Sequence, residues 1–244
     1  MKKIKFKKYA MILLGGLLTV SSSIYANPIQ TPEGKMPFVH WAVVEATEGH
    51  MPQILSLGVK NVAPTAAKEL GTYALYGGVD KHNSNLLRIL EIYEDENAYQ
   101  IHRSSNGFKL YQLERANFLS KLIILEAKPI VLEQKSTGTG SSVYMDLIVV
   151  KSDKIDEYEN LIRKEMQRAV NDDEGVLGLF ATAEKDNPGR IHTMGIYENQ
   201  TAYERYIHSS NYKNFCESVE AMIMKQHSIE NQPTAIVLSS KGLN

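Results

Sequence analysis

A carboxylate and an imidazole that could exchange protons lie near each other in the first half of the sequence, Glu91 and His102. A hydrogen bond between a glutamate and a histidine fixes the tautomer of the imidazole and raises its basicity. Such a pair could accept a proton from a bound ligand, although pairs of this kind also serve to hold a helix against a strand. Tyrosines that could wall a cavity or hydrogen-bond to a flat ligand occur at four nearby positions, Tyr73, Tyr76, Tyr93 and Tyr99.

A strand predicted at 38–46 adds two further candidates, His40 and Trp41. Successive side chains of a strand point to opposite faces of the sheet. We therefore expect one of these two side chains to line the same cavity as the tyrosines. The tyrosines also have an alternative role, because aromatic side chains dominate the packing of hydrophobic cores.

These candidates lie in a segment that the chain repeats. At an offset of 104 residues the sequence aligns Ile92-Tyr93-Glu94 with Ile196-Tyr197-Glu198 without a gap, and Gly71 with Gly175. A constant offset over most of the chain predicts two copies of one module, with the same elements in the same order.

Each copy is predicted to contain a strand, a helix, a two-stranded hairpin, a second helical stretch and a closing strand. Apolar residues recur at helical spacing between Ile155 and Val170 in the second copy, whereas Gly58 and Pro64 predict a shorter or bent helix in the first. The order β-α-β-β-α-β predicts an α+β fold of two tandem ferredoxin-like modules. The second helical stretches are expected at 95–121 and 199–226, the closing strands at 127–132 and 232–238, the two modules at 36–132 and 142–240, and a flexible linker at 133–141.

The run from Glu91 to Lys109 resembles the antibiotic biosynthesis monooxygenase family, which includes the small quinol monooxygenases. The resemblance rests on a strand ending in Glu-x-Tyr, an acidic turn, Ala98-Tyr99 followed by His102, and then Phe108-Lys109. Members of the family pair through their sheets into a dimeric α+β barrel. The resemblance implies that the two copies in this chain form such a barrel together, as an intramolecular pseudo-dimer, and leaves a further homodimer open.

The resemblance also implies a chemistry. Characterised members oxidise quinols or polycyclic phenols with O2 and need no metal or flavin, so we expect no cofactor, and a small aromatic or quinol-like molecule and O2 as partners. His102 and Glu91 match the histidine and glutamate positions of the family and are the catalytic candidates. The candidates for substrate binding are Tyr73, Tyr76, Tyr93, Tyr99, His40 and Trp41; no metal site is expected.

The second copy departs from this pattern, because Gly195 stands where the first copy has Glu91 and Tyr206 where it has His102. We expect this copy to be mainly a structural partner, or to bind a different ligand. Two interpretations of the whole chain follow: a cofactor-independent monooxygenase of a quinol-like or phenolic molecule, or a non-catalytic tandem barrel that binds a small apolar ligand or serves in assembly.

The first 26 residues predict a cleaved export signal, with a lysine-rich start, an apolar run from Ala10 to Val20 and a small residue at Ala26. The apolar run is too short to span a membrane. This segment holds five lysines and no acidic residue, so its removal changes the net charge from −1 to −6. An acidic chain lacks the electrostatic footprint of a nucleic-acid-binding protein. We expect a bacterial protein of the periplasm or the medium, and Cys216, the only cysteine, excludes an internal disulfide.

Overall fold

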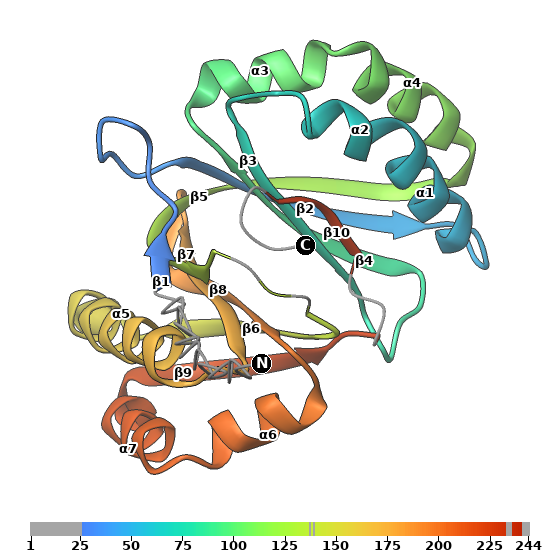
Figure 1. Cartoon of the computed structure of the whole chain (residues 1–244). Coiled ribbons are helices and arrows are strands. Elements are labelled where there is room, and N and C mark those ends of the chain that lie inside the picture. Colours follow the sequence, from blue (N-terminus) through green and yellow to red (C-terminus); the bar gives the residue numbers. More distant parts are fainter. Residues whose placement is uncertain (1–25, 137, 139, 233–235, 241–244) are drawn as a thin grey trace, which may run out of the picture.

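The computed structural model describes residues 26–136, 138, 140–232 and 236–240. The predicted export signal lies outside these residues apart from Ala26, which begins the short strand β1 (Ala26–Pro28). Two modules of one design follow, with the helices of each on the outside and the sheet between them (Figure 1). The first module contains β2 (Phe38–Ala46), α1 (Met51–Leu57), the π-helix η1 (Gly58–Val62), α2 (Ala63–Ala66), β3 (Thr72–Val79), β4 (Leu86–Tyr93), α3 (Glu96–Ser104), α4 (Asn106–Arg115), η2 (Ala116–Phe118) and β5 (Leu119–Lys135).

The second module repeats this order, so the predicted β-α-β-β-α-β plan and α+β class are confirmed. Its first helix is continuous, whereas the first module has the bent helix predicted from Gly58 and Pro64: α1 passes through a π-turn into α2. The second module contains β6 (Ser142–Val150), η3 (Ser152–Lys154), α5 (Ile155–Asp172), β7 (Val176–Glu184), β8 (Asn187–Tyr197), α6 (Gln200–His208), α7 (Ser210–Val219), η4 (Glu220–Met222) and β9 (Ile223–Glu230), and is followed by β10 (Ile236–Ser240).

The repeated motif residues shape the same local structure in both modules. The Asp95 carboxylate accepts from the backbone N–H of Ala98 and so caps the start of α3. Ser105 caps α4 in the same way and interrupts the helical stretch between the two helices. A Cβ placed on Gly71 would lie 2.6 Å from the Cβ of Ala98, so only glycine lets the start of β3 approach α3 this closely.

The same relationships recur in the second module. Asn199 and Ser209 cap α6 and α7, and a Cβ on Gly175 would lie 2.5 Å from the Cβ of Ala202. The residues that align at the 104-residue offset thus fix where the second helical stretch begins and how closely it packs against the start of the hairpin.

The strands form one antiparallel sheet with the order β10-β3-β4-β2-β5-β7-β8-β6-β9, and β1 pairs with β5. β5 belongs to both modules, because residues 119–127 pair with β2 and residues 127–134 pair with β7. In the second module β10 has the corresponding role, because it follows β9 in the chain and pairs with β3 of the first module. Each module thus extends a strand onto the edge of the other, as expected for the predicted pseudo-dimer.

The closing strands differ from the prediction in both copies. They begin earlier than expected, at Leu119 and Ile223, so the helical stretches end at 118 and 222 rather than 121 and 226. In the second copy β9 takes the closing position, and the predicted strand 232–238 corresponds in part to β10, which pairs with the other module. Glu133 and Gln134 of the predicted linker pair with β7 and belong to β5.

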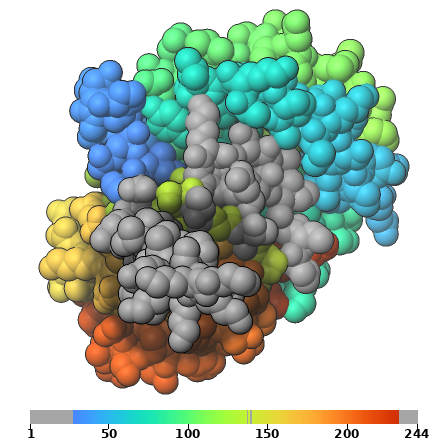
Figure 2. Space-filling view, viewed as in Figure 1, coloured from blue at the N-terminus to red at the C-terminus, as the bar shows by residue number. Residues whose placement is uncertain are grey.

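Three hydrophobic clusters hold the molecule together. One lies between the helices and sheet of each module, and the third fills the space between the modules, where Trp41 and Tyr76 pack with Phe180 and Met194. In the space-filling view the start of the described chain, in blue, lies against α5 of the second module, in yellow (Figure 2). Backbone hydrogen bonds from Lys81 to Glu230 and from Gln232 to Val79 join the ends of the sheet. None of the helices among the described residues is long and apolar enough to cross a membrane.

Candidate functional site

His102 lies on α3 and is almost fully buried, with 1% of its surface exposed. Its Nδ1 lies 2.7 Å from Oε2 of Glu69, the carboxylate at the end of the loop before β3. The same oxygen accepts the Thr72 hydroxyl at 2.7 Å. The predicted hydrogen bond from His102 to Glu91 is therefore wrong: the side chain of Glu69 reaches the imidazole, and the rings of Tyr93 and Phe108 flank it at 5.6 and 4.9 Å.

Glu91 lies near the end of β4 on the face of the sheet that the helices cover. Its carboxylate accepts the Tyr93 hydroxyl at 3.2 Å. Burial raises the pKa of Glu91 to about 7, although the hydrogen bond from Tyr93 and the positive charges of Arg115 and Arg103 act in the opposite direction. A carboxyl group with this pKa exchanges its proton near neutral pH, as a general base must.

His40 and Tyr99 extend this cluster. His40 lies directly opposite Glu91 in the register of β2 with β4, and its ring contacts that of Tyr99 edge-on, with the centroids 4.3 Å apart. Burial lowers the pKa of His40, and its buried Nδ1 has no hydrogen-bond partner within the described part of the chain. Five predicted site residues thus share the helix-covered face of the first module: Glu91, His102, Tyr93, Tyr99 and His40.

The other three predicted site residues lie on the opposite face of the sheet, toward the second module. Trp41 donates its indole N–H to the Thr182 hydroxyl at 2.9 Å, and Tyr76 donates its hydroxyl to Gln134 at 2.6 Å. Tyr73 packs at the border of the same inter-module cluster. Of the two neighbours on the first strand, His40 therefore faces the helices and Trp41 the partner module.

A small cavity joins Glu91 and His102 between the helices and the sheet of the first module. It has a volume of about 30 Å³ and is otherwise lined by apolar and aromatic side chains, among them Phe108 and Tyr111. This volume admits about two water molecules. The residues that could exchange protons are thus in contact with a space too small for an aromatic ring.

The corresponding space in the second module is much larger, with a volume of about 530 Å³. Many of its walls are formed by residues at the 104-residue offset from those of the small cavity: Tyr206 replaces His102, Tyr212 replaces Phe108, and Phe215 replaces Tyr111. Cavities of this size hold small organic ligands in other proteins. The second module thus combines the space for a ligand with the absence of the histidine and glutamate.

In the first module a glycine brings α4 directly against the helical segments beside it. A Cβ on Gly107 in α4 would lie 2.0 Å from the Thr65 hydroxyl and 2.3 Å from the Asn61 carbonyl oxygen, so α4 packs directly on η1 and α2. Position 211 of α7, which aligns with Gly107, holds an asparagine. This asparagine is exposed, so the glycine contact between α4 and η1 has no counterpart in the second module.

Gly195 also makes room for an aromatic group. A Cβ at this position would lie 2.4 Å from the hydroxyl oxygen of Tyr197, so the Tyr197 ring occupies the space over the glycine. In the first module the corresponding tyrosine, Tyr93, donates to the Glu91 carboxylate instead. The loss of the glutamate and the position of the tyrosine therefore go together.

The floor of the large cavity carries a polar network around Asp146 on β6. Its Oδ1 accepts the Ser228 hydroxyl at 2.5 Å and the Gln226 amide at 3.1 Å, and its Oδ2 accepts the Thr193 hydroxyl at 3.3 Å. The residues at the corresponding positions of the first module are all apolar: Ala42, Ile124, Leu122 and Ile89. This network is a feature of the second module alone.

Sequence reasoning missed Glu69, Arg115 and Asp146. Glu69 was visible as the Glu69-x-Gly71 motif that aligns with Asp173-x-Gly175, but nothing pointed to a contact with His102. Arg115, which is 5% exposed with its guanidinium 4.9 Å from the Tyr111 ring, gave no signal. Asp146 was the single charge in the apolar run 143–150. No group of three or more metal-ligating side chains occurs among the described residues.

Comparison with known proteins agrees with this arrangement. Residues 145–218 match the family model for antibiotic biosynthesis monooxygenase. No curated protein matches the chain. Among solved structures, a proposed monooxygenase from Lactobacillus acidophilus has a TM-score of 0.76 at 18% identity, over 84% of this chain and 100% of that chain. One from Fusobacterium nucleatum has a TM-score of 0.75 at 18% identity, over 84% and 93% of the two chains. An anthrone oxidase-like protein has a TM-score of 0.58 at 10% identity, over 88% and 98%.

The fold defines the chain as a tandem α+β protein in which two ferredoxin-like modules share one antiparallel sheet. The likeness to the solved structures concerns this fold and extends over both modules. The match to the antibiotic biosynthesis monooxygenase model lies within the second module, and the first module repeats its element order and its motif residues.

Proposed function

We propose that the protein is a monooxygenase that oxidises a quinol-like or phenolic small molecule with O2. The observation that carries the proposal is the pairing of two proton-accepting groups, Glu91 and His102, along one apolar cavity beneath the helices. Burial holds the pKa of Glu91 at about 7, so this carboxylate can take the proton of a phenol at neutral pH. The phenolate that results is rich in electrons and transfers them to O2 directly.

The reaction balances without a further reductant. A quinol and one O2 give a hydroxyquinone and one water: one oxygen atom enters the ring, and the other leaves as water with the two hydrogens that the quinol loses. The residues of the chain orient the phenol, accept its proton and keep bulk water away from the reduced oxygen species. Glu69 acts on His102, because its carboxylate fixes the imidazole with Nδ1 toward the carboxylate and Nε2 away from it.

Substrate entry requires the small cavity to widen, and its walls suggest where. Gly58 and Val62, which line the cavity, belong to the π-helix η1, and π-helical turns occur frequently at functional sites. Outward movement of η1 from α4 would separate the Val62 and Phe108 side chains, which both line the cavity. The substrate would then contact Glu91 and His102 from the side of the helices.

Oxygen uptake by the purified protein with a panel of hydroquinones tests this proposal. We expect substrate-dependent uptake that Glu91→Gln and His102→Gln reduce at least a hundredfold, as for the loss of a general base. Tyr206→Phe in the second module is the matched control and should retain uptake. Uptake that survives His102→Gln but is abolished by Tyr206→Phe would place the reaction in the second module and contradict the proposal.

A second candidate function is the non-catalytic binding of a small molecule, and the volume of the cavity in the second module favours it. A ligand that binds only the folded protein raises the melting temperature by mass action. Stabilisation by phenolic compounds without any O2 uptake would support this function over the first.

We also propose that the chain is exported from a bacterial cell and cleaved after Ala26. The proposal rests on the five lysines and the apolar run that precede this residue. Mass spectrometry of the protein from periplasmic and medium fractions tests it: the mature chain should begin at Asn27, and a full-length chain confined to the cytoplasm would contradict it.

A further inference from the structure

The large cavity of the second module has a surplus of negative charge. Its ionisable lining groups are four acids and one base, Asp146, Glu165, Glu217, Glu220 and Lys225. Glu165 is neutralised by Arg168, whose Nη2 lies 2.7 Å from its carboxylate. Glu217, Glu220 and Lys225 are all exposed, whereas Asp146 is half-buried. The remaining carboxylates make the cavity favourable for a cation and unfavourable for an anion.

Aromatic rings surround this negative charge. Tyr206 and Tyr212 lie with their ring centroids 4.7 Å apart, and Phe215 lies 6.1 Å from Tyr212 and 6.4 Å from Tyr158. Adjacent rings are inclined by 43° to 58°, so they form an angled wall rather than a stack. Rings at these angles suit the offset and edge-to-face packing of an aromatic ligand, and their faces also attract a nearby ammonium group through cation–π contacts.

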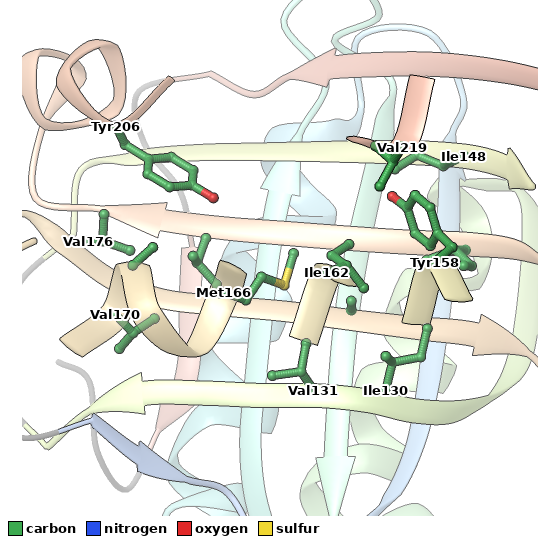
Figure 3. Packing of buried hydrophobic residues seen from close by; sticks show 14 of the residues in the cluster. Ile130, Val131, Ile148, Tyr158, Ile162, Met166, Val170, Val176, Tyr206 and Val219 are labelled. Carbon is green, nitrogen blue, oxygen red and sulfur yellow. The ribbon is translucent and has the colours of Figure 1, made fainter. Parts of the chain in front are cut away.

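Two tyrosine hydroxyls point into the space between the helices and the sheet. Figure 3 shows the hydroxyl groups of Tyr206 and Tyr158 directed toward each other, with Met166 and Ile162 between them. The two residues are 5% and 1% exposed. No described residue hydrogen-bonds to either hydroxyl, and neither oxygen is among the fully buried unpaired atoms, so both oxygens are accessible from the cavity. Because buried tyrosine hydroxyls usually have a partner, they leave polar positions for a ligand to fill.

The tyrosines remain neutral donors in this environment. Burial raises the pKa of Tyr158 and of Tyr212, and the negative charge of Asp146 raises both further. Burial also raises the pKa of Tyr206. The aromatic wall therefore carries no negative charge of its own, and the charge of the cavity resides on its carboxylates.

Asp146 has a remaining position for a ligand. A carboxylate offers about four lone-pair sites, and Ser228, Gln226 and Thr193 fill two on Oδ1 and one on Oδ2. The three donors hold the carboxylate rigidly on the floor of the cavity. One lone pair of Oδ2 is left for a donor that enters the cavity.

We propose that the second module binds a small organic ammonium ion with an aromatic group, such as an arylalkylamine, with its charge at Asp146 and its ring among Tyr158, Tyr206 and Phe215. The volume of about 530 Å³ accommodates a ligand of this size. The proposal concerns the second module alone and does not depend on the reaction proposed for the first. The apolar residues at the corresponding positions exclude the same ligand from the first module.

Isothermal titration with three compounds of one shape tests the proposal on the full mature chain. Tyramine is a cation, 4-ethylphenol is its neutral counterpart, and 3-(4-hydroxyphenyl)propionate is the anion. We expect tyramine to bind at least tenfold more tightly than 4-ethylphenol, since one ion pair or cation–π contact supplies about this factor. We expect no binding of the propionate. Equal binding of tyramine and 4-ethylphenol, or tighter binding of the propionate, would overturn the proposal.

Two variants separate the contributions of charge and ring. Asp146→Asn should weaken the binding of tyramine about tenfold and leave the affinity for 4-ethylphenol unchanged. Glu159→Gln, which removes a charge from α5 outside the cavity, should change neither affinity. If Asp146→Asn fails to fold, Phe215→Leu at the partly exposed wall serves instead and should weaken both tyramine and benzyltrimethylammonium. Unchanged tyramine affinity in a folded Asp146→Asn or Phe215→Leu variant would contradict the proposed site.

Discussion

The imidazole of His102 on α3 is held by the carboxylate of Glu69, which comes from the loop before β3 and lies 2.7 Å from its Nδ1. The side chains are 1% and 12% exposed, so the pair is shielded from water. A hydrogen bond to a charged, buried partner contributes more to stability than a bond at the surface. The link between the start of β3 and α3 therefore depends on this contact.

Glu69→Ala should lower the free energy of unfolding by about 2–3 kcal/mol, because it leaves the imidazole and the Thr72 hydroxyl without their acceptor. Urea unfolding followed by circular dichroism measures this loss. Glu157→Ala removes an exposed ion pair with Lys154 and should cost less than about 1 kcal/mol. Equal losses in the two variants would show that the buried pair has no special part in stability.

The half-buried carboxyl of Glu91 should make stability depend on pH. Its pKa rises from 4.5 to about 7 on folding, so between these values the native state holds a proton that the unfolded chain has released. The free energy of unfolding therefore falls as pH rises through this window, by up to about 3 kcal/mol. Glu91→Gln should remove this component, so the variant should exceed the wild type in stability at pH 8 and match it at pH 5. Urea unfolding at each pH measures this. A difference in free energy of unfolding between the two proteins that stays constant from pH 5 to pH 8 would exclude the raised pKa.

The fold could be predicted from the sequence because each module was represented twice. Ser105 and Gly71 recur in the second copy at the 104-residue offset, which indicated a structural role for both. Ser105 proves to cap α4, and Gly71 lets the start of β3 approach α3. The ends of the closing strands were harder to place, since Leu122 to Leu125 form a continuous apolar run directly after a helix. A run of this kind has no periodicity that separates a strand from a buried helix.

The candidate site was predicted in part. Glu91 and His102 do line one cavity, but the partner of His102 comes from the loop before β3, and its contact depends on how α3 lies over the sheet. The sizes of the two cavities could not be predicted at all. They depend on how the helices pack over the sheet, which no local pattern in the sequence reveals.

Gly107 should be needed for the close packing of the first module. Gly107→Ala places a methyl group within 2.0 Å of the Thr65 hydroxyl and 2.3 Å of the Asn61 carbonyl oxygen, and overpacking of this kind costs about 1–3 kcal/mol. Asn211→Ala, at the exposed aligned position in the second module, should change stability by less than about 0.5 kcal/mol. Thermal unfolding of both variants checks the difference, and a Gly107→Ala protein as stable as the wild type would show that α4 can shift without loss.

The shared core predicts that the two modules unfold together. Trp41, the only tryptophan in the chain, lies in the inter-module cluster and donates its indole N–H to Thr182 of the second module. Thr182→Val keeps the shape of the side chain but leaves a buried donor unpaired, which costs about 1–3 kcal/mol. Because one cluster joins both modules, the variant should shift the Trp41 fluorescence transition and the far-ultraviolet circular dichroism transition by the same amount. Separate transitions, with only the fluorescence shifted, would mean that each module folds without the other.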